Sequence, residues 1–314
     1  MPEVSFVVTL FNKAKYIPAL THSIFSQRNL GDCEYIFVDD GSTDDTLSIL
    51  KQCTASRSNV KIVEQVNVGP SLATNRGIAE ATRPYIKFVD GDEILHPQGT
   101  SELLKAMSFF NVGMAFGHGE EIPFTSEKMR APNLPLSSEP AKLIEEPLAF
   151  VARTAMFNLT CLITSTKLAR DIGGCDPKVF IQDYSFALRL AAKTKFAFVP
   201  GVLYWAPLEI ADRASELGGG AQVLHDLNLA LGHFVSENPG LDPRIKALML
   251  QRAAGRAWKW AKRREGEKLL SKHYFRYLCS VLSPKTGNTS GRILETCQAF
   301  PARTIRLTSN VKEP

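Results

Sequence analysis

The chain has 314 residues, of which 44% are hydrophobic and 22% are charged. This length can bury a full core, and the composition excludes fibrous, disordered and disulfide-rich proteins. The six cysteines are widely spaced, with no C-x-x-C pair and no histidine at zinc-finger spacing, so we expect free thiols. We see no signal peptide and no apolar run of about 18 residues, and we therefore expect a cytoplasmic protein.

The net charge of +5 is unevenly distributed along the chain. Residues 1–243 contain 21 Lys and Arg against 28 Asp and Glu, whereas residues 244–314 contain 16 against 4. This asymmetry predicts an acidic body and a basic C-terminal region. We expect an α/β domain over residues 1–223, a basic helical extension over 224–282, and a polar tail of uncertain order over 283–314.

The first hundred residues alternate between apolar runs and apolar residues at helical spacing. The runs predict strands at residues 4–10, 35–38, 60–63 and 85–89, with a helix after each of the first three. Ser42 or Thr43 could cap the second of these helices, whose apolar face would include Leu47 and Leu50. This alternation predicts parallel strands with right-handed crossovers, hence an α/β sheet with helices on both faces.

The second half of the chain reads less regularly. Residues 120–147 are rich in Pro, Ser and Glu, which suggests a long loop or an insertion. We then expect a strand at 159–164, a helix at 167–172, a helix beginning near Asp183, and strands at 196–199 and 202–205. From residue 224 to about 282 the pattern is helical.

Three polar clusters follow predicted strands, at residues 9–12, 39–40 and 90–92. Because ligands of such sheets bind beyond the carboxyl ends of the strands, we expect the clusters to meet in one crevice. Asp90 and Asp92 offer hard oxygen ligands to magnesium or manganese, although a solvated turn would look the same. Asp39 and Asp40 would repel phosphate but suit hydrogen bonds with a base or ribose; the alternative is a helix-capping turn.

The order of these motifs resembles the family 2 glycosyltransferases, which have the GT-A fold. The resemblance rests on the segments at 7–12, 37–44, 67–78, 85–92, 172–176 and 182–189, and it extends over roughly residues 3–205. It implies a GT-A type α/β domain with a C-terminal helical extension. It also implies a sugar donor activated as a nucleoside diphosphate, commonly uridine diphosphate, and a Mn or Mg ion.

The resemblance also implies roles for individual residues. Thr9 and Phe11 would border the nucleobase, with Phe11 where the family often has Tyr. The contacts with base and ribose would come from Asp39, Asp40 and Asn75. Asp92 would be the main metal ligand, and Asp90 would contact ribose or metal-bound water.

Asp183 would be the catalytic base in an inverting displacement. A sugar hydroxyl is a poor nucleophile, so a carboxylate must accept its proton, and a helix N-terminus favours the ionised form. A simple helix cap is the alternative for this residue. The chain departs from the family pattern at Gln182, Thr74 and Glu93, where Glu, Arg and Asp are frequent, and the first two changes bear on donor and acceptor identity.

The basic C-terminal region allows two interpretations. Its cations alternate with apolar and aromatic residues, as in a helix that lies on an anionic membrane. The alternative is a helix that packs its apolar face on the catalytic domain. Nucleic-acid binding is not expected, because no recognised module accompanies the charge. The apolar positions are Leu250, Trp258, Trp260, Leu269, Leu270, Phe275, Tyr277 and Leu278.

The sequence therefore predicts a glycosyltransferase that acts on a glycan or lipid-linked acceptor in surface polysaccharide or glycolipid assembly. The enzyme would be cytoplasmic, with a peripheral membrane contact through residues 244–282. Two other functions remain open. A nucleotidyltransferase could use the same acidic cluster and metal but would release pyrophosphate, and a non-catalytic relative would bind nucleotide sugar or act as a scaffold.

Overall fold

The computed structural model describes residues 1–123, 136–154, 157–208, 220–282 and 287–301. The chain forms two compact units, each discontinuous in sequence. The first unit comprises residues 1–147, 158–175 and 193–210, and the second comprises 148–157, 176–192 and 211–314. This division differs from the linear boundary at residue 223, because residues 148–157, 176–192 and 211–223 belong to the second unit.

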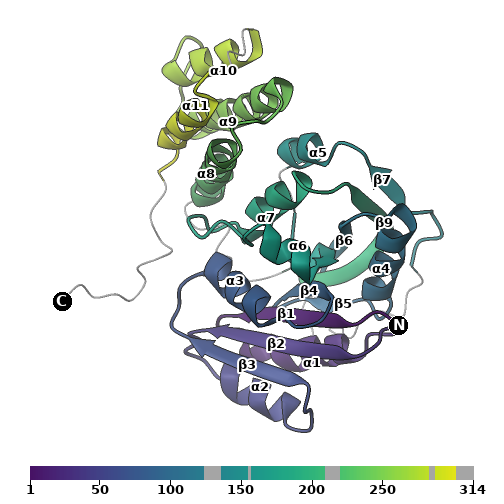
Figure 1. Ribbon diagram of the computed structural model, residues 1–314. Coiled ribbons are helices and arrows are strands. Elements are labelled where there is room, and N and C mark those ends of the chain that lie inside the picture. The colour runs from purple at the N-terminus through teal and green to yellow at the C-terminus, as the bar shows by residue number, and fades with distance from the viewer. Residues whose placement is uncertain (124–135, 155–156, 209–219, 283–286, 302–314) are drawn as a thin grey trace. The chain divides into compact units, whose positions relative to one another are not determined.

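The first unit is built around four parallel strands in the order β3-β2-β1-β4. They are β1 (Val4–Leu10), β2 (Cys33–Asp40), β3 (Val60–Gln65) and β4 (Tyr85–Asp90), so the four expected strands are confirmed. The chain moves one way along the sheet from β1 to β3 and the other way from β3 to β4. Right-handed crossovers then put α1 (Ile17–Phe25) and α2 (Thr46–Thr54) on one face and α3 (Pro70–Glu80) on the other (Figure 1).

The sheet continues past β4 with mixed strand directions, in the order β4-β8-β6-β9-β5, and β7 also pairs with β9. These strands are β8 (Leu162–Ser165), β6 (Met114–Ile122), β9 (Phe196–Pro207), β5 (Ile94–Leu95) and β7 (Lys142–Ile144). The helices of this part are α4 (Gly99–Phe110) and α6 (Thr166–Asp171).

Two expectations for this part of the chain are wrong in detail. The two short strands expected at 196–199 and 202–205 form one strand, β9, because Gly201 takes a φ of +109° and lets the strand continue through an irregular register. The strand expected at 159–164 begins instead with a 3-10 turn, η2 (Leu159–Cys161), whose N-cap Asn158 accepts a hydrogen bond from the Thr160 N–H. Of the long loop expected at 120–147, residues 124–135 lie outside the described part.

In the core of the first unit, helix α3 packs closely against strand β1. β1 is buried along almost its whole length, as expected of a central strand covered on both faces. On one face, α3 can approach β1 because Gly77 has no side chain: a Cβ there would lie 2.2 Å from Cγ1 of Val7. This packing fixes the carboxyl end of β1 relative to the loop that follows β3.

The second unit is helical in its described residues. It contains α5 (Pro147–Thr154), α7 (Gln182–Ala191), α8 (Ala221–Glu237), α9 (Pro243–Arg264), α10 (Lys272–Leu282) and α11 (Thr289–Thr296). The single helical stretch expected from 224 to 282 is thus three helices, interrupted before Pro243 and around Gly266. Asn228 on α8 joins them by donating to the Ala253 carbonyl on α9 and to Oγ1 of Thr296 on α11, at 3.0 and 2.8 Å.

Part of the segment expected to be a polar tail is ordered. Helix α11 buries Ile293 completely, and the 3-10 turn η4 (Cys297–Ala299) follows it. Residues 283–286 and 302–314 lie outside the described part. Within the described chain, none of the helices combines the length and the apolar character needed to cross a bilayer.

Candidate active site

The carboxyl ends of β1, β2 and β4 bring the predicted polar clusters together. Thr9 on β1 lies beside Val38 of β2 on one side and beside Asp90 of β4 on the other. One position later, Leu10 pairs with Asp39. Because the three strands are parallel and adjacent, the residues that follow them emerge at one edge of the sheet. The three polar clusters therefore meet at one edge of the sheet, as expected from sequence, whereas a ligand crevice at this edge stays a prediction.

The turn after β4 holds three carboxylates in a small volume. Asp92 and Glu93 are buried, with exposed fractions of 8% and 4%. The Glu93 N–H donates to the Asp90 carbonyl at 3.1 Å, and the Asp90 N–H donates to Oγ1 of Thr160 at 2.9 Å. A Cβ on Gly91 would lie 2.9 Å from the Thr9 carbonyl oxygen and 2.7 Å from a methyl carbon of Leu10. Glycine is required here because the turn lies directly against the end of β1.

Burial and mutual repulsion raise the pKa values of two carboxyl groups in this cluster. Burial, followed by the charge of Asp92, raises the pKa of Asp90 to about 6, although Lys13 and Lys87 act in the opposite direction. Burial and the charges of Asp90 and Asp92 also raise the pKa of Glu93 well above its ordinary value. A bound cation would relieve this repulsion.

Two lysines lie close enough to these carboxylates to interact with their charge. Nζ of Lys13 lies 2.5 Å from Oδ2 of Asp92. Lys87 is 2% exposed and donates to the carbonyl oxygens of Thr160 and Phe88. Burial lowers the pKa of its ammonium group to about 8 despite the nearby anionic groups. Sequence reasoning missed both lysines; the signal available for Lys13 was its place directly after the polar end of β1.

The donor chemistry of this turn fits a divalent cation held jointly with a phosphate. Asp90 and Asp92 supply carboxylate oxygens, and magnesium and manganese are commonly bound by one or two carboxylates together with substrate phosphates. In the described residues, no group of three or more His, Cys, Asp or Glu side chains has the arrangement to hold a metal alone. One oxygen of Glu93 is buried without a hydrogen-bond partner among the described residues, while the other accepts from Asn158 at 2.7 Å.

The two neighbouring carboxylates at the end of β2 have different partners. Asp40 accepts three hydrogen bonds: from Nε2 of Gln65 at 2.7 Å and from the N–H groups of Val68 and Gly69 at 3.0 and 2.9 Å. Both bonds to Asp39 come from Ser42, whose Oγ and N–H donate at 2.5 and 3.2 Å. Asp40 thus orders the loop between β3 and α3, whereas Asp39 keeps more of its accepting capacity.

A second set of hydrogen bonds joins the loop after β1 to the loop after β2. The Asn12 N–H donates to Oγ of Ser42 at 3.0 Å, and the Asn12 side-chain oxygen accepts from the Thr43 N–H at 2.8 Å. Asn12 takes a φ of +54°, which turns the chain sharply after Phe11. Phe11 is 44% exposed at this rim, where an aromatic face is open to a ligand.

The helix cap predicted after β2 is wrong in its position. Helix α2 begins at Thr46, four residues beyond Ser42, and neither Ser42 nor Thr43 caps it. The N-cap residue is Asp45, which makes no side-chain cap bond, and the carboxylate of the preceding Asp44 accepts from the N–H and Oγ1 of Thr46 at 3.0 and 2.5 Å. It also accepts from the Ala14 N–H at 3.2 Å. The Asp39–Asp44 segment is therefore part of the site's framework.

Asn75 contacts the protein main chain. Its amide nitrogen donates to the Cys175 carbonyl at 2.9 Å, and its amide oxygen accepts from the Cys175 N–H at 2.7 Å. The pair holds a turn in which Gly173 and Gly174 both have positive φ, of 75° and 67°. These bonds give Asn75 an anchoring role, and a contact with nucleotide stays a prediction.

Asp183 lies in the second unit, as the second residue of α7. Its carboxylate accepts from the Tyr184 N–H at 2.6 Å, and the side chain is half-buried. Within that unit α7 is tied to α8 by the ion pair of Arg189 with Glu237 at 3.1 Å. The helix expected to begin near Asp183 is confirmed, and the residue's role as a base stays a prediction.

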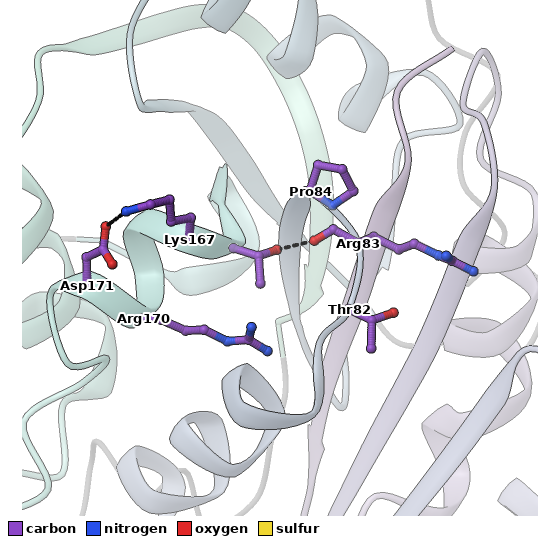
Figure 2. A pocket seen from close by; sticks show the side chains of 7 residues that line it. Thr82, Arg83, Pro84, Lys167, Arg170 and Asp171 are labelled. Carbon is purple, nitrogen blue, oxygen red and sulfur yellow. Dashed lines mark hydrogen bonds and ion pairs between the residues drawn. The ribbon is translucent and has the colours of Figure 1, made fainter.

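A surface pocket of about 380 Å³ lies at the opposite end of β4 from the acidic turn (Figure 2). Its cations already have partners within the protein. Lys167 pairs with Asp171 at 2.5 Å, Arg83 pairs with Asp32 at 2.5 Å, and Arg170 donates to main-chain carbonyls at the end of α3. The pocket is therefore a structural joint between α3, β4 and α6.

Comparison with solved structures agrees with this fold. The crystal structure of S. aureus TarS 1–349 superposes with a TM-score of 0.65 at 15% identity, covering 94% of this chain and 89% of that one. The mannosyltransferase PcManGT from Pyrobaculum calidifontis, solved with GDP-Man and Mn2+, gives a TM-score of 0.62 at 16% identity, covering 95% and 86%. At these identities the likeness concerns the fold, which is of the GT-A type expected from sequence.

Comparison with sequences identifies the family. The glycosyltransferase YibD of Escherichia coli K12 is 34% identical over 95 residues, and the chondroitin synthase of Escherichia coli is 36% identical over 97. These segments are 30% and 31% of this chain but only 27% and 14% of the relatives, so the chain matches a minor part of their length. The profile described as "Glycosyl transferase family 2" matches residues 5–161, which is half of the chain. The chain therefore belongs to glycosyl transferase family 2.

Proposed function

We propose that this chain transfers a sugar from a nucleoside-diphosphate sugar, with uridine diphosphate as the first candidate, to an acceptor hydroxyl. The observation that carries the proposal is the convergence of Thr9, Asp39 and the Asp90–Asp92 turn at the ends of three adjacent parallel strands. Nucleotides bind at this edge in open parallel sheets. Family membership supports the proposal, as does a structural match of TarS in complex with UDP-GlcNAc.

In this proposal the nucleoside binds between β1 and β2. The exposed ring of Phe11 stacks on the base, and Thr9 borders it. Asp39 accepts hydrogen bonds from the nucleoside, while Asp40 mainly holds the adjacent loop in place through its three bonds. Asp90 contacts the ribose.

The diphosphate and a divalent ion bind at the turn after β4. Asp92, assisted by Asp90, would hold Mn or Mg, and a bound ion neutralises charge on the departing diphosphate. The raised pKa values of Asp90 and Glu93, caused first by burial and then by the neighbouring carboxylates, support this assignment, because a bound cation would favour the ionised carboxylates. Lys13 pairs with Asp92, and in this proposal its ammonium group contacts a phosphate oxygen.

The transfer step is a single displacement at the anomeric carbon. Asp183 accepts the proton of the acceptor hydroxyl, whose oxygen forms a bond with the anomeric carbon. The bond between that carbon and the diphosphate oxygen breaks, and the electron pair leaves with the nucleoside diphosphate. The attack and the departure occur on opposite sides, so the configuration inverts.

The acceptor we propose is a glycan or a lipid-linked saccharide in surface polysaccharide or glycolipid assembly. Support comes from relatives described as chondroitin synthase and as cholesterol galactosyltransferase, the latter from Borreliella burgdorferi at 35% identity over 91 residues. A peripheral contact with an anionic membrane through residues 244–282 belongs to this proposal, because it would bring the enzyme to such an acceptor.

Calorimetric titration with UDP, GDP and their sugar conjugates, with and without manganese, tests the donor site. We expect one nucleotide to bind in a metal-dependent manner, and Asp92→Ala to abolish that dependence. Asp171→Ala, at an exposed carboxylate that ends α6, is the matched control and should bind as the wild type does. If no nucleotide binds, the catalytic proposal fails and a non-catalytic role is favoured.

Two product analyses test the reaction itself. A nucleoside diphosphate must be released, because pyrophosphate would indicate a nucleotidyltransferase. The anomeric configuration of the product, read by NMR, must be inverted relative to the donor. A retained configuration would contradict the single displacement with Asp183 as base.

A further inference from the structure

The corner between α9 and α10 exposes large apolar side chains. Leu269 and Leu270 in the connecting turn are 65% and 74% exposed, and Phe275 and Leu282 on α10 are 47% and 73% exposed. Along α10, the exposed residues Lys272, Phe275, Cys279 and Leu282 are spaced by three, four and three positions. This spacing puts them on one face of the helix. The corner therefore exposes four large apolar side chains, two in the turn and two on one face of α10.

The other face of α10 is fixed to α9. The ring of Tyr274 packs edge-on against Trp258 at a centroid distance of 5.1 Å. Trp258 and Trp260 are buried, at 8% and 9% exposure, and Leu250 is buried at 3%. Of the residues expected to reach a membrane, these three instead form the interior of the helical unit. The candidate surface is thereby narrowed to the turn and the outer face of α10.

The turn before α10 holds a leucine in a conformation that leucine rarely adopts. Leu270 has a φ of +80°, in the left-handed region that favours glycine or asparagine. Its side chain projects into solvent, so it contributes little packing to offset this strain. Backbone outliers of this kind cluster at functional sites. An asparagine at this position would suit the backbone better.

Positive charge surrounds this apolar surface. Between residues 262 and 272 the chain carries five exposed cations and two acids, Glu265 and Glu267. Glu267 lies 3.0 Å from Nδ1 of His273, so it is partly engaged within the turn. Basic residues beside exposed leucine and phenylalanine match the interface of an anionic bilayer. The five cations are Lys262, Arg263, Arg264, Lys268 and Lys272.

We infer that residues 262–282 dock on an anionic lipid bilayer. Leu269, Leu270, Phe275 and Leu282 enter the interfacial layer, and the surrounding cations contact the headgroup phosphates. A second copy of the chain is a poorer occupant, because a symmetric contact would oppose two sets of like charges. The inference gives the proposed transferase access to a lipid-linked acceptor, but its evidence is independent of the donor chemistry.

Co-sedimentation of the full chain with vesicles tests the docking. The vesicles are phosphatidylcholine alone or phosphatidylcholine with one-third phosphatidylglycerol, each at low and high salt. We expect binding to the anionic vesicles that weakens with salt, because the charge contribution is screened. Replacing both leucines, as Leu269→Ser with Leu270→Asn, should weaken binding by about tenfold or more.

Two controls separate docking from a structural defect. Phe109→Ser removes a side chain that is 82% exposed on α4 of the first unit, and it should bind vesicles as the wild type does. The leucine variant should keep its circular dichroism and its nucleotide affinity, so failure of docking is distinguishable from failure of the proposed transfer. Equal vesicle binding by the leucine variant and by Phe109→Ser would overturn the inference. Self-association in ultracentrifugation that the leucine variant abolishes, without vesicle binding, would overturn it in favour of a second copy.

Discussion

Replacing Asp40 by Asn should destabilise the chain far more than the same change at Asp39, although the two residues are neighbours. Asp40 is 4% exposed, and its carboxylate accepts three hydrogen bonds, two of them from the N–H groups of Val68 and Gly69. Asparagine has one acceptor oxygen, and its amide group would face a donor. Losing one or two bonds to a charged acceptor, at about 1.5–3 kcal/mol each, predicts a loss of about 1.5–6 kcal/mol.

Asp39 provides the matched control for this prediction. Its two bonds both come from Ser42, and an asparagine can accept from the Ser42 N–H while donating to the Ser42 hydroxyl oxygen. We therefore expect Asp39→Asn to change stability by no more than about 1 kcal/mol. The assay is urea denaturation followed by circular dichroism, combined with calorimetric titration of UDP. Equal denaturation midpoints for the two variants, or unchanged UDP affinity in Asp39→Asn, would refute the division of roles between these carboxylates.

Three further predictions concern the acidic turn and the helical unit. Gly91→Ala should lower stability by about 1–3 kcal/mol and weaken metal-dependent nucleotide binding, because its Cβ would approach the end of β1 too closely. Gly255→Ala in α9, where a Cβ meets only ordinary contacts, should instead gain up to about 1 kcal/mol by the same denaturation assay. Lys13→Met should tighten manganese binding in the absence of nucleotide, since it frees the Asp92 carboxylate from its ion pair. An unchanged calorimetric affinity for manganese would count against Asp92 as the metal ligand. Burial acts to raise the pKa of Asp176, but hydrogen bonds from His233 and the Lys178 N–H hold it below its usual value near 3.8. Its stabilising effect is thus present above about pH 4 and lost as pH falls through the lowered pKa, so Asp176→Asn should flatten acid denaturation in that range.

The fold of the first hundred residues could be predicted because its determinants are local. Each buried parallel strand is an uninterrupted apolar run, and each run ends where polar residues begin, so strands and their carboxyl ends can be located from sequence. β1 lies at residues 4–10 as predicted. Beyond residue 110 the strands pair in both directions, since β8 is antiparallel to β4 and β6 whereas β6 and β9 are parallel. Their order depends on long-range pairing that leaves no periodic signal.

In the candidate site, too, long-range contacts could not be predicted from sequence. Spacing along the chain identified the acidic residues at 39–40 and 90–92, because motifs at strand ends are short and contiguous. It could not show that Lys13 pairs with Asp92, seventy-nine positions away, or that Asn75 binds the main chain of Cys175. Hydrogen bonds depend on distances set by packing, so the partner of each polar group appears only in the folded chain.

The basic C-terminal region shows most clearly which properties follow from sequence and which follow from packing. The amino-acid sequence shows that residues 244–314 are strongly basic and that aromatic and cationic residues alternate there. Reasoning from sequence assigned Trp258, Trp260 and Leu270 to the same membrane-facing set, because all three are apolar and lie among cations. Only the tertiary structure separated them: α9 buries both tryptophans, while the turn before α10 leaves Leu270 exposed with a positive φ. Burial depends on which helix faces are covered by neighbours, and that is decided by packing among segments distant in sequence.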